Sequence, residues 1–136
     1  MAEIPYLRTV ASKGWTALGD CGIAALGTLL SQTYEDVVAV AVRLEIPWKS
    51  GMWGSQMVKI ALEFGATLKK RRKYDLEHVT GLVMVNILDF PAKTKRVDHV
   101  VVVWRGILID SDGYVWEPDA FISHYQAKLG ELLELQ

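Results

Sequence analysis

Apolar residues recur at helical spacing through the first half of the chain, and this pattern predicts three helices. The first helix is predicted to begin near Asp20, a residue type that often caps helix N-termini. The second is predicted to begin after Thr33, where Asp36 completes an imperfect capping box, and to end before Pro47. The third covers residues 55–64, where apolar side chains return every three or four positions.

The pattern then changes to runs of β-branched and other strand-forming residues. Residues 66–75 and 81–88 are predicted to be strands. Residues 98–113 predict a β-hairpin, because two strongly β-prone runs are separated by Arg105 and Gly106, which suit a two-residue turn. An antiparallel sheet is therefore expected to follow the helices.

The end of the chain predicts one more short strand and a helix. Residues 113–116 can add the strand, and residues 118–136 are predicted to form a terminal helix that Pro118 begins and Gly130 interrupts. Helices first and an antiparallel sheet after them indicate the α+β class. Without repeats or low-complexity linkers, residues 1–136 are expected to form a single domain.

Composition and charge exclude several classes of function. The chain has 136 residues, of which 51% are hydrophobic, and a net charge of −1, so no general attraction to nucleic acid or to a membrane is expected. No signal peptide or membrane-spanning run is recognised, which predicts a cytoplasmic protein of a bacterium or phage, or a virion-associated one if the source is a virus. The single cysteine cannot form an internal disulfide.

That cysteine, Cys21, is the first candidate for chemistry. It is predicted to lie in the first turn of a helix, where unpaired N–H groups and the helix dipole stabilise a thiolate. Gly22 follows it and permits close approach of another chain. The alternative is that Cys21 is a small apolar residue of the core, which is the more common role of a lone cysteine in an alanine-rich helix.

A nucleophilic cysteine needs a base and a group that orients the base, and the hairpin offers both. A two-residue turn would place His99 opposite Asp112, with Asp110 two residues earlier on the same face. Either aspartate can accept from the imidazole. A shift of one residue in the register would turn both carboxylates away.

The stretches "GDCGIAALGTLL" and "DHVVVVWRGILIDSD" resemble the papain-like cysteine peptidases that trim double-glycine leader peptides. The resemblance covers roughly residues 15–113 and implies a standalone bacteriocin-processing-peptidase-like domain, with helices packed on an antiparallel sheet. It implies a thiol peptidase acting on a peptide or protein, without metal or cofactor. By this resemblance Cys21 is the nucleophile, His99 the general base and Asp110, in preference to Asp112, the orienting acid.

The chain departs from that family at two positions. The family has a glutamine six residues before the cysteine to hold the oxyanion, whereas this chain has Trp15 there, followed by Thr16. Ser111 follows Asp110 where the family has a proline. Trp15 and Thr16 are therefore the candidates for an oxyanion donor, and Trp53 joins them as a candidate for the cleft.

Two alternatives to a peptidase follow from the same sequence. The missing glutamine favours a papain-like domain that no longer cleaves and that binds a peptide or a partner protein in its groove. The basic run at residues 69–73 could bind phosphates, although a solvated edge strand is the simpler interpretation. His78 and His124 are expected to be structural or surface residues, no metal-ligand spacing is present, and the sequence predicts no oligomeric state.

Overall fold

The structure, a computed structural model, describes residue 10 and residues 20–49, 51–88 and 93–136. Within these residues the chain is an α+β protein with four α-helices and a six-stranded antiparallel sheet. The α+β class and the antiparallel sheet are as the sequence predicts. The elements in chain order are α2 (Cys21–Leu30), α3 (Tyr34–Arg43), α4 (Gly54–Glu63), β1 (Leu68–Arg71), the 3-10 turn η1 (Leu76–His78), β2 (Thr80–Leu88), β3 (Arg96–Trp104), β4 (Ile107–Ile109), β5 (Val115–Trp116), α5 (Pro118–Tyr125) and β6 (Lys128–Leu135).

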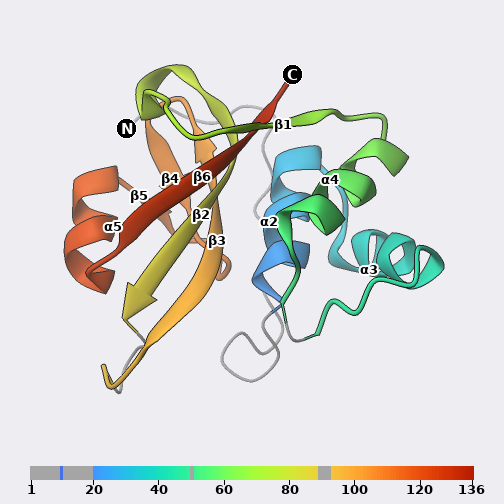
Figure 1. The fold of residues 1–136 in the computed structure, drawn as a ribbon, viewed down its shortest axis with the longest axis horizontal. Helices are drawn as coiled ribbons and strands as arrows, with labels where there is room; N and C mark the ends of the chain where they lie inside the picture. Colours follow the sequence, from blue (N-terminus) through green and yellow to red (C-terminus); the bar gives the residue numbers. More distant parts are fainter. Residues whose placement is uncertain (1–9, 11–19, 50, 89–92) are drawn as a thin grey trace.

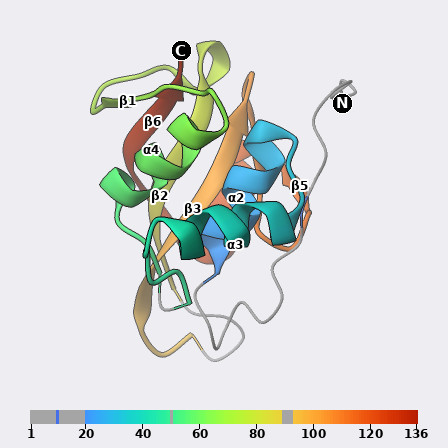
Figure 2. The ribbon, with the colours of Figure 1, turned by 90° about the vertical axis from the view of Figure 1, so that its right-hand side faces the viewer.

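The sheet separates two groups of helices. Its strands lie in the order β1-β6-β2-β3-β4-β5. Helices α2, α3 and α4 gather on one side of it and α5 lies on the other (Figure 1). Viewed from the helical side, α2, α3 and α4 stand in front of the strands (Figure 2).

Strand β3 contributes to the core on both faces of the sheet. Val100 and Val102 are buried in the cluster that includes α2, α3 and α4. Val101 and Val103 are buried in the second cluster, which includes Phe121 of α5. This alternation is what a strand with both faces covered requires, and it explains the run of four valines.

The hairpin forms with the predicted turn. Arg105 and Gly106 both have positive φ, 43° and 89°, as a two-residue turn of this hand demands. Trp104 pairs with Ile107 and Val102 pairs with Ile109, so the register assumed from the sequence is correct where the strands pair.

The predicted terminal helix is wrong beyond its first eight residues. Helix α5 ends at Tyr125, because Gln126 turns into the left-handed region with φ of 48°. The following residues form β6, which inserts between β1 and β2 and buries Leu132 and Leu133. The Leu, Glu and Lys residues of this segment favour a helix locally, but strand pairing on both sides overrides that preference.

The two predicted helix starts differ in their caps. Thr33 caps α3, and its side chain accepts from the Asp36 N–H at 3.1 Å, as expected. Asp20 occupies the N-cap position of α2, but its side chain makes no capping hydrogen bond and instead accepts from the Tyr34 hydroxyl at 2.7 Å. Asp20 therefore ties α2 to α3 through its side chain instead of capping α2 with it.

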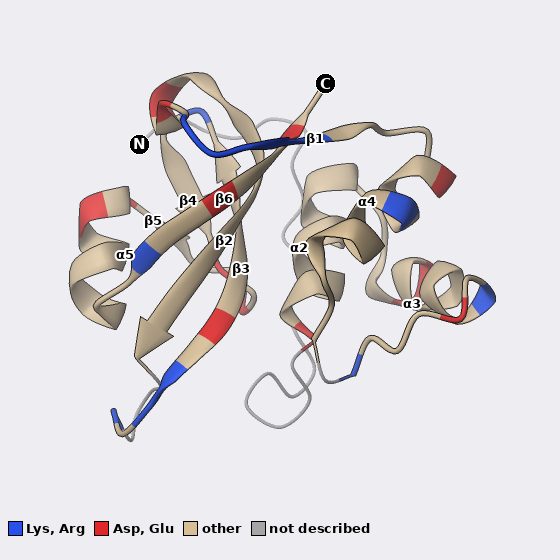
Figure 3. Cartoon of the chain, viewed as in Figure 1, with Lys and Arg blue, Asp and Glu red and all other residues tan. Residues whose placement is uncertain are grey.

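The basic run forms the edge strand β1 and is paired with acidic residues of β6. Lys70 lies 3.1 Å from Glu131, and Arg71 lies 2.8 Å from Glu134. Figure 3 shows the basic strand crossing beside acidic positions of β6. These ion pairs support the interpretation of residues 69–73 as a charged sheet edge. In the described part of the chain, no helix has the length and apolar character needed to cross a membrane.

Candidate active site

Cys21 is the first residue of α2, as the sequence predicts. Helix α2 packs against β3, so its N-terminal end faces the strand that carries His99. The thiol is half-buried and lines a cleft together with His99. The first turn of the helix presents its N–H groups to any negative charge on or near the sulfur.

His99 lies between the thiol and a carboxylate. Its Nε2 is 2.7 Å from Oδ1 of Asp110, and the side chains of these two residues are only 7% and 5% exposed. The imidazole lines the same cleft as the Cys21 thiol, which helps to raise the pKa of His99. Since Nε2 is engaged by Asp110, Nδ1 is the nitrogen left for the thiol.

The structure brings Asp110, and not Asp112, to the histidine. Asp110 directly follows β4, and its Oδ1 also accepts from the Ser111 N–H at 2.8 Å. Its own N–H donates to the Tyr114 carbonyl at 2.9 Å, which closes the turn into β5. The backbone N–H of Ser111 thus holds the carboxylate, and a proline at this position would have no such donor.

The pKa values of the pair move in opposite directions. Burial lowers the pKa of His99, but the hydrogen bonds and charges of Asp110 and Cys21 outweigh it and raise the pKa to about 10. Burial raises the pKa of Asp110, but the bonds from His99, Ser111 and Tyr125 lower it overall. For Asp112, burial and the nearby charge of Asp110 raise the pKa. The site therefore favours an imidazolium held by an ionised Asp110.

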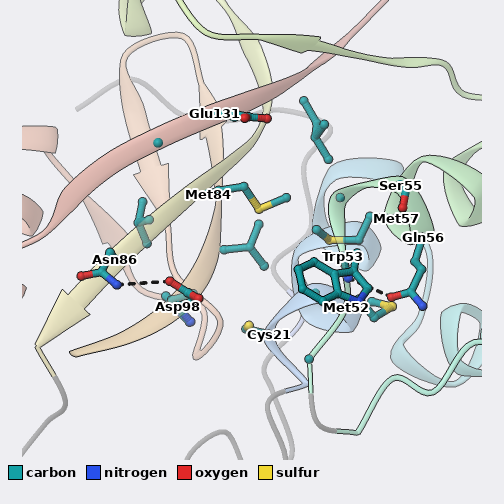
Figure 4. A pocket seen from close by; sticks show the side chains of 18 of the residues that line it. Cys21, Met52, Trp53, Ser55, Gln56, Met57, Met84, Asn86, Asp98 and Glu131 are labelled. Atoms are coloured by element: carbon teal, nitrogen blue, oxygen red, sulfur yellow. Dashed lines mark hydrogen bonds between the residues drawn. The ribbon is translucent and has the colours of Figure 1, made fainter. Parts of the chain in front are cut away.

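The cleft beside Cys21 has a volume of about 1140 Å³ and runs between the helices and the sheet. Figure 4 shows Met52, Trp53 and Met57 on the helical wall, and Asn86 and Asp98 on the sheet wall, with the Cys21 sulfur at the base between them. The sheet wall is fixed by a bond of 3.1 Å from the Asn86 amide to the Asp98 carboxylate. Both walls carry apolar side chains, Met52 and Met57 on one and Met84 on the other, and Asn86 and Asp98 add polar groups to the sheet wall.

Of the three residues predicted to be oxyanion donors or to line the cleft, the structure describes one. Trp53 lines the cleft, is 78% exposed and occupies the N-cap position of α4, where its N–H donates to Gln56. Trp15 and Thr16 lie outside the described residues. The glycine pair around Trp53 was the sequence signal for its exposure.

Tyr125 is a residue of the site that the sequence did not indicate. It ends α5, lines the same cavity as Asp110 on the side of the sheet opposite α2, and helps to lower the pKa of that carboxyl group. No sequence signal marks it, because the contact depends on how α5 folds back onto the sheet.

The other two histidines have no thiol beside them. His78 is exposed and pairs with Asp75 at 2.9 Å, and His124 lies on α5 against Trp116. Within the described ranges, no group of three or more His, Cys, Asp or Glu side chains could hold a metal ion.

Comparison with known proteins adds no family assignment. No protein-family model matches the sequence, and a search of curated proteins finds no match. The interpretation of the site therefore depends on its geometry.

Proposed function

We propose that the protein is a thiol hydrolase with a papain-like fold, and that it cleaves peptide bonds with Cys21, His99 and Asp110. One observation carries the proposal: a buried imidazole bonds to a carboxylate through Nε2 and lines the same cleft as the only thiol of the chain, which lies near enough to raise the pKa of the imidazole. The helix that carries the cysteine and the hairpin that carries the histidine and aspartate face each other, as that fold requires.

The first chemical step would form a thioester. The Cys21 thiolate attacks the substrate carbonyl, and the negative charge moves to the carbonyl oxygen, which the Cys21 N–H stabilises. When the tetrahedral intermediate collapses, the His99 imidazolium gives its proton to the leaving amine, and the carbon–nitrogen bond breaks. Asp110 keeps the ring oriented throughout.

The second step would hydrolyse the thioester. Neutral His99 takes a proton from water, the hydroxide attacks the thioester carbonyl, and the thiolate leaves as the acid product forms. The proton on His99 restores the starting ion pair, so no further reagent is consumed.

An extended peptide is the substrate class that suits the cleft. The cleft is open at the surface and offers apolar side chains such as Met57 and Trp53 on one wall. Asn86 and Asp98 on the opposite wall offer polar groups to a peptide backbone. The ion pairs of β1 argue against phosphate binding by the basic run.

Alkylation by iodoacetamide as a function of pH tests the proposal. An ordinary cysteine has a pKa of about 8.5, so its reactivity falls about tenfold for each pH unit below that value. The proposed mechanism requires a thiolate paired with the His99 imidazolium, so it predicts that the wild-type protein keeps reacting at Cys21 well below pH 7. In His99→Ala, the alkylation rate of Cys21 is expected to fall about tenfold for each pH unit below about 8.5, as it does for an ordinary cysteine.

His78→Ala is the matched control, because it removes a histidine that pairs with an aspartate but contacts no thiol. It should leave the profile unchanged. An ordinary cysteine profile in the wild-type protein would refute the proposed function. Peptide hydrolysis that survives Cys21→Ser would refute it as well.

The absence of a glutamine before Cys21 favours a second candidate, a papain-like domain that binds a peptide without cleaving it. In that case the wild-type protein binds peptides in the cleft but releases no products. Cys21→Ser would then leave peptide binding intact, and the peptidase proposal requires turnover that this substitution abolishes.

A further inference from the structure

A second cavity, of about 410 Å³, lies on the other side of His99 from the cleft. His99 borders both cavities, and Asp110 lines only the second. The remaining lining residues are Ile87, Ser111, Asp112, Tyr114, Trp116, His124 and Tyr125. Four of these residues, Tyr114, Trp116, His124 and Tyr125, place aromatic side chains in the cavity that Asp110 lines. Trp116 belongs to β5, and His124 and Tyr125 belong to α5.

The ring of Tyr125 is fixed within that group. Its centroid lies 5.0 Å from that of Phe121, 5.7 Å from that of Trp116 and 4.6 Å from that of His124. Phe121 is fully buried in the core on this face of the sheet. A ring held by three neighbours has little freedom to redirect its hydroxyl, and Tyr125 lines the same cavity as Asp110.

We propose that Tyr125 is a positioning residue for the triad, and that its hydroxyl holds the Asp110 carboxylate in the orientation that accepts from His99. The inference rests on the proposed function. With His99 and the Ser111 N–H both bonded to Oδ1, the carboxylate needs a further donor to fix its rotation. Tyr125 supplies that donor from a different element of the fold.

The pKa values agree with this contact. The hydrogen bond from Tyr125 helps to lower the pKa of Asp110. Burial, the charges of Asp110 and Asp112 and the bond to Asp110 raise the pKa of Tyr125, so the hydroxyl stays protonated and able to donate. The titratable groups that line the cavity beside Asp110 are His99 of β3, Asp112 and Tyr114 of the turn between β4 and β5, and His124 and Tyr125 of α5, while Cys21 of α2 lies across His99 in the cleft. No Lys or Arg is among the described residues that line this cavity.

Tyr125→Phe tests the inference, because it removes one oxygen and keeps the ring in its packing. The rate of Cys21 alkylation by iodoacetamide near neutral pH is expected to fall about three- to tenfold, as the loss of one bond to a charged group implies. The pKa of Asp110, followed by the carbon-13 shift of its carboxyl carbon, is expected to rise by about 0.5–1 unit. Tyr74→Phe, which removes the bond of 2.6 Å from another tyrosine hydroxyl to the Gly130 carbonyl, is the control for stability.

A double-mutant cycle separates positioning from a general structural role. If Tyr125 acts through Asp110, Tyr125→Phe has little additional effect in an Asp110→Asn background. An additive effect in that background, or an unchanged pKa of Asp110 in the single variant, would overturn the inference. The proposed function stands or fails separately, since it depends on the wild-type pH profile and on His99→Ala.

Discussion

Replacement of Asp110 by asparagine isolates the charge of the orienting group from its geometry. The two side chains have nearly the same size. With the amide oxygen in place of Oδ1, the substituted side chain still accepts from His99 and from the Ser111 N–H. The negative charge is lost while the ring keeps its partner, so the substitution acts chiefly on the stability of the imidazolium.

The structure sets the expected size of the change in the pKa of His99. A bond of 2.7 Å between two groups with 7% and 5% exposure is little screened by solvent. Exchanging a charge-assisted bond for a neutral one, together with the lost attraction, destabilises the imidazolium by about 1.5–3 kcal/mol. One pKa unit corresponds to about 1.4 kcal/mol, so the shift is about one to two units downward. The pKa of His99, about 10 in the wild-type protein, should fall to about 8–9.

An NMR titration of the histidine rings measures this change directly, and His99→Ala identifies the resonance. Asp112→Asn is the matched control, because that carboxyl group lies nearby but does not bond to the imidazole, and it should move the pKa by less than about 0.5 unit. An unchanged pKa of His99 in Asp110→Asn would refute the reasoning. A larger shift in Asp112→Asn would show that the wrong aspartate had been assigned.

Three further outcomes follow from close contacts and from the site. Gly81→Ala should lower the free energy of unfolding in urea by about 3 kcal/mol or more, because the added Cβ would lie 2.1 Å from a backbone oxygen of β6. Gly54→Ala is the control: its Cβ would make ordinary contacts from 3.6 Å, so the free energy of unfolding should change by less than about 1 kcal/mol. Gly22→Ala, whose Cβ would lie 2.7 Å from the end of Met52, should displace that flexible side chain and alter peptide turnover or binding while iodoacetamide still reaches the thiol. Because folding lowers the pKa of Asp110, ionised Asp110 stabilises the fold above about pH 3.9, and this stabilisation is lost as the pH falls through the folded-state pKa. Acid should therefore reduce the urea midpoint of the wild-type protein more steeply than that of Asp110→Asn.

The parts of the fold that the sequence predicted are those that short-range patterns determine. The hairpin follows from two β-prone runs and a turn at Arg105 and Gly106, and its register then aligns His99 with the aspartates. The cap by Thr33 depends on residues only three positions apart. Cys21 could be placed at a helix start for the same reason, because a helix boundary is read from the residues beside it.

The parts that the sequence did not predict depend on contacts between distant segments. Residues 128–135 carry leucine, glutamate and lysine, which favour a helix, but they form a strand because they pair with β1 on one side and with β2 on the other. Tyr125 reaches Asp110 only once α5 has packed on the sheet. The role of Asp20 was misjudged for a related reason, since the Tyr34 hydroxyl competes with the helix for its carboxylate.

The position of His99 between two cavities divides the proposed site into parts that can be varied separately. Substrate would reach the imidazole from the cleft that Cys21 lines, whereas Asp110, which also raises the pKa of the imidazole, lies against the second cavity together with Tyr125. Substitutions in the cleft wall, such as those at Met52, should therefore change which peptides bind but leave the pKa of His99 unaltered. Substitutions of residues that line the second cavity should instead change the pKa of His99 and leave peptide binding unaltered, because these residues lie outside the cleft that a peptide would enter.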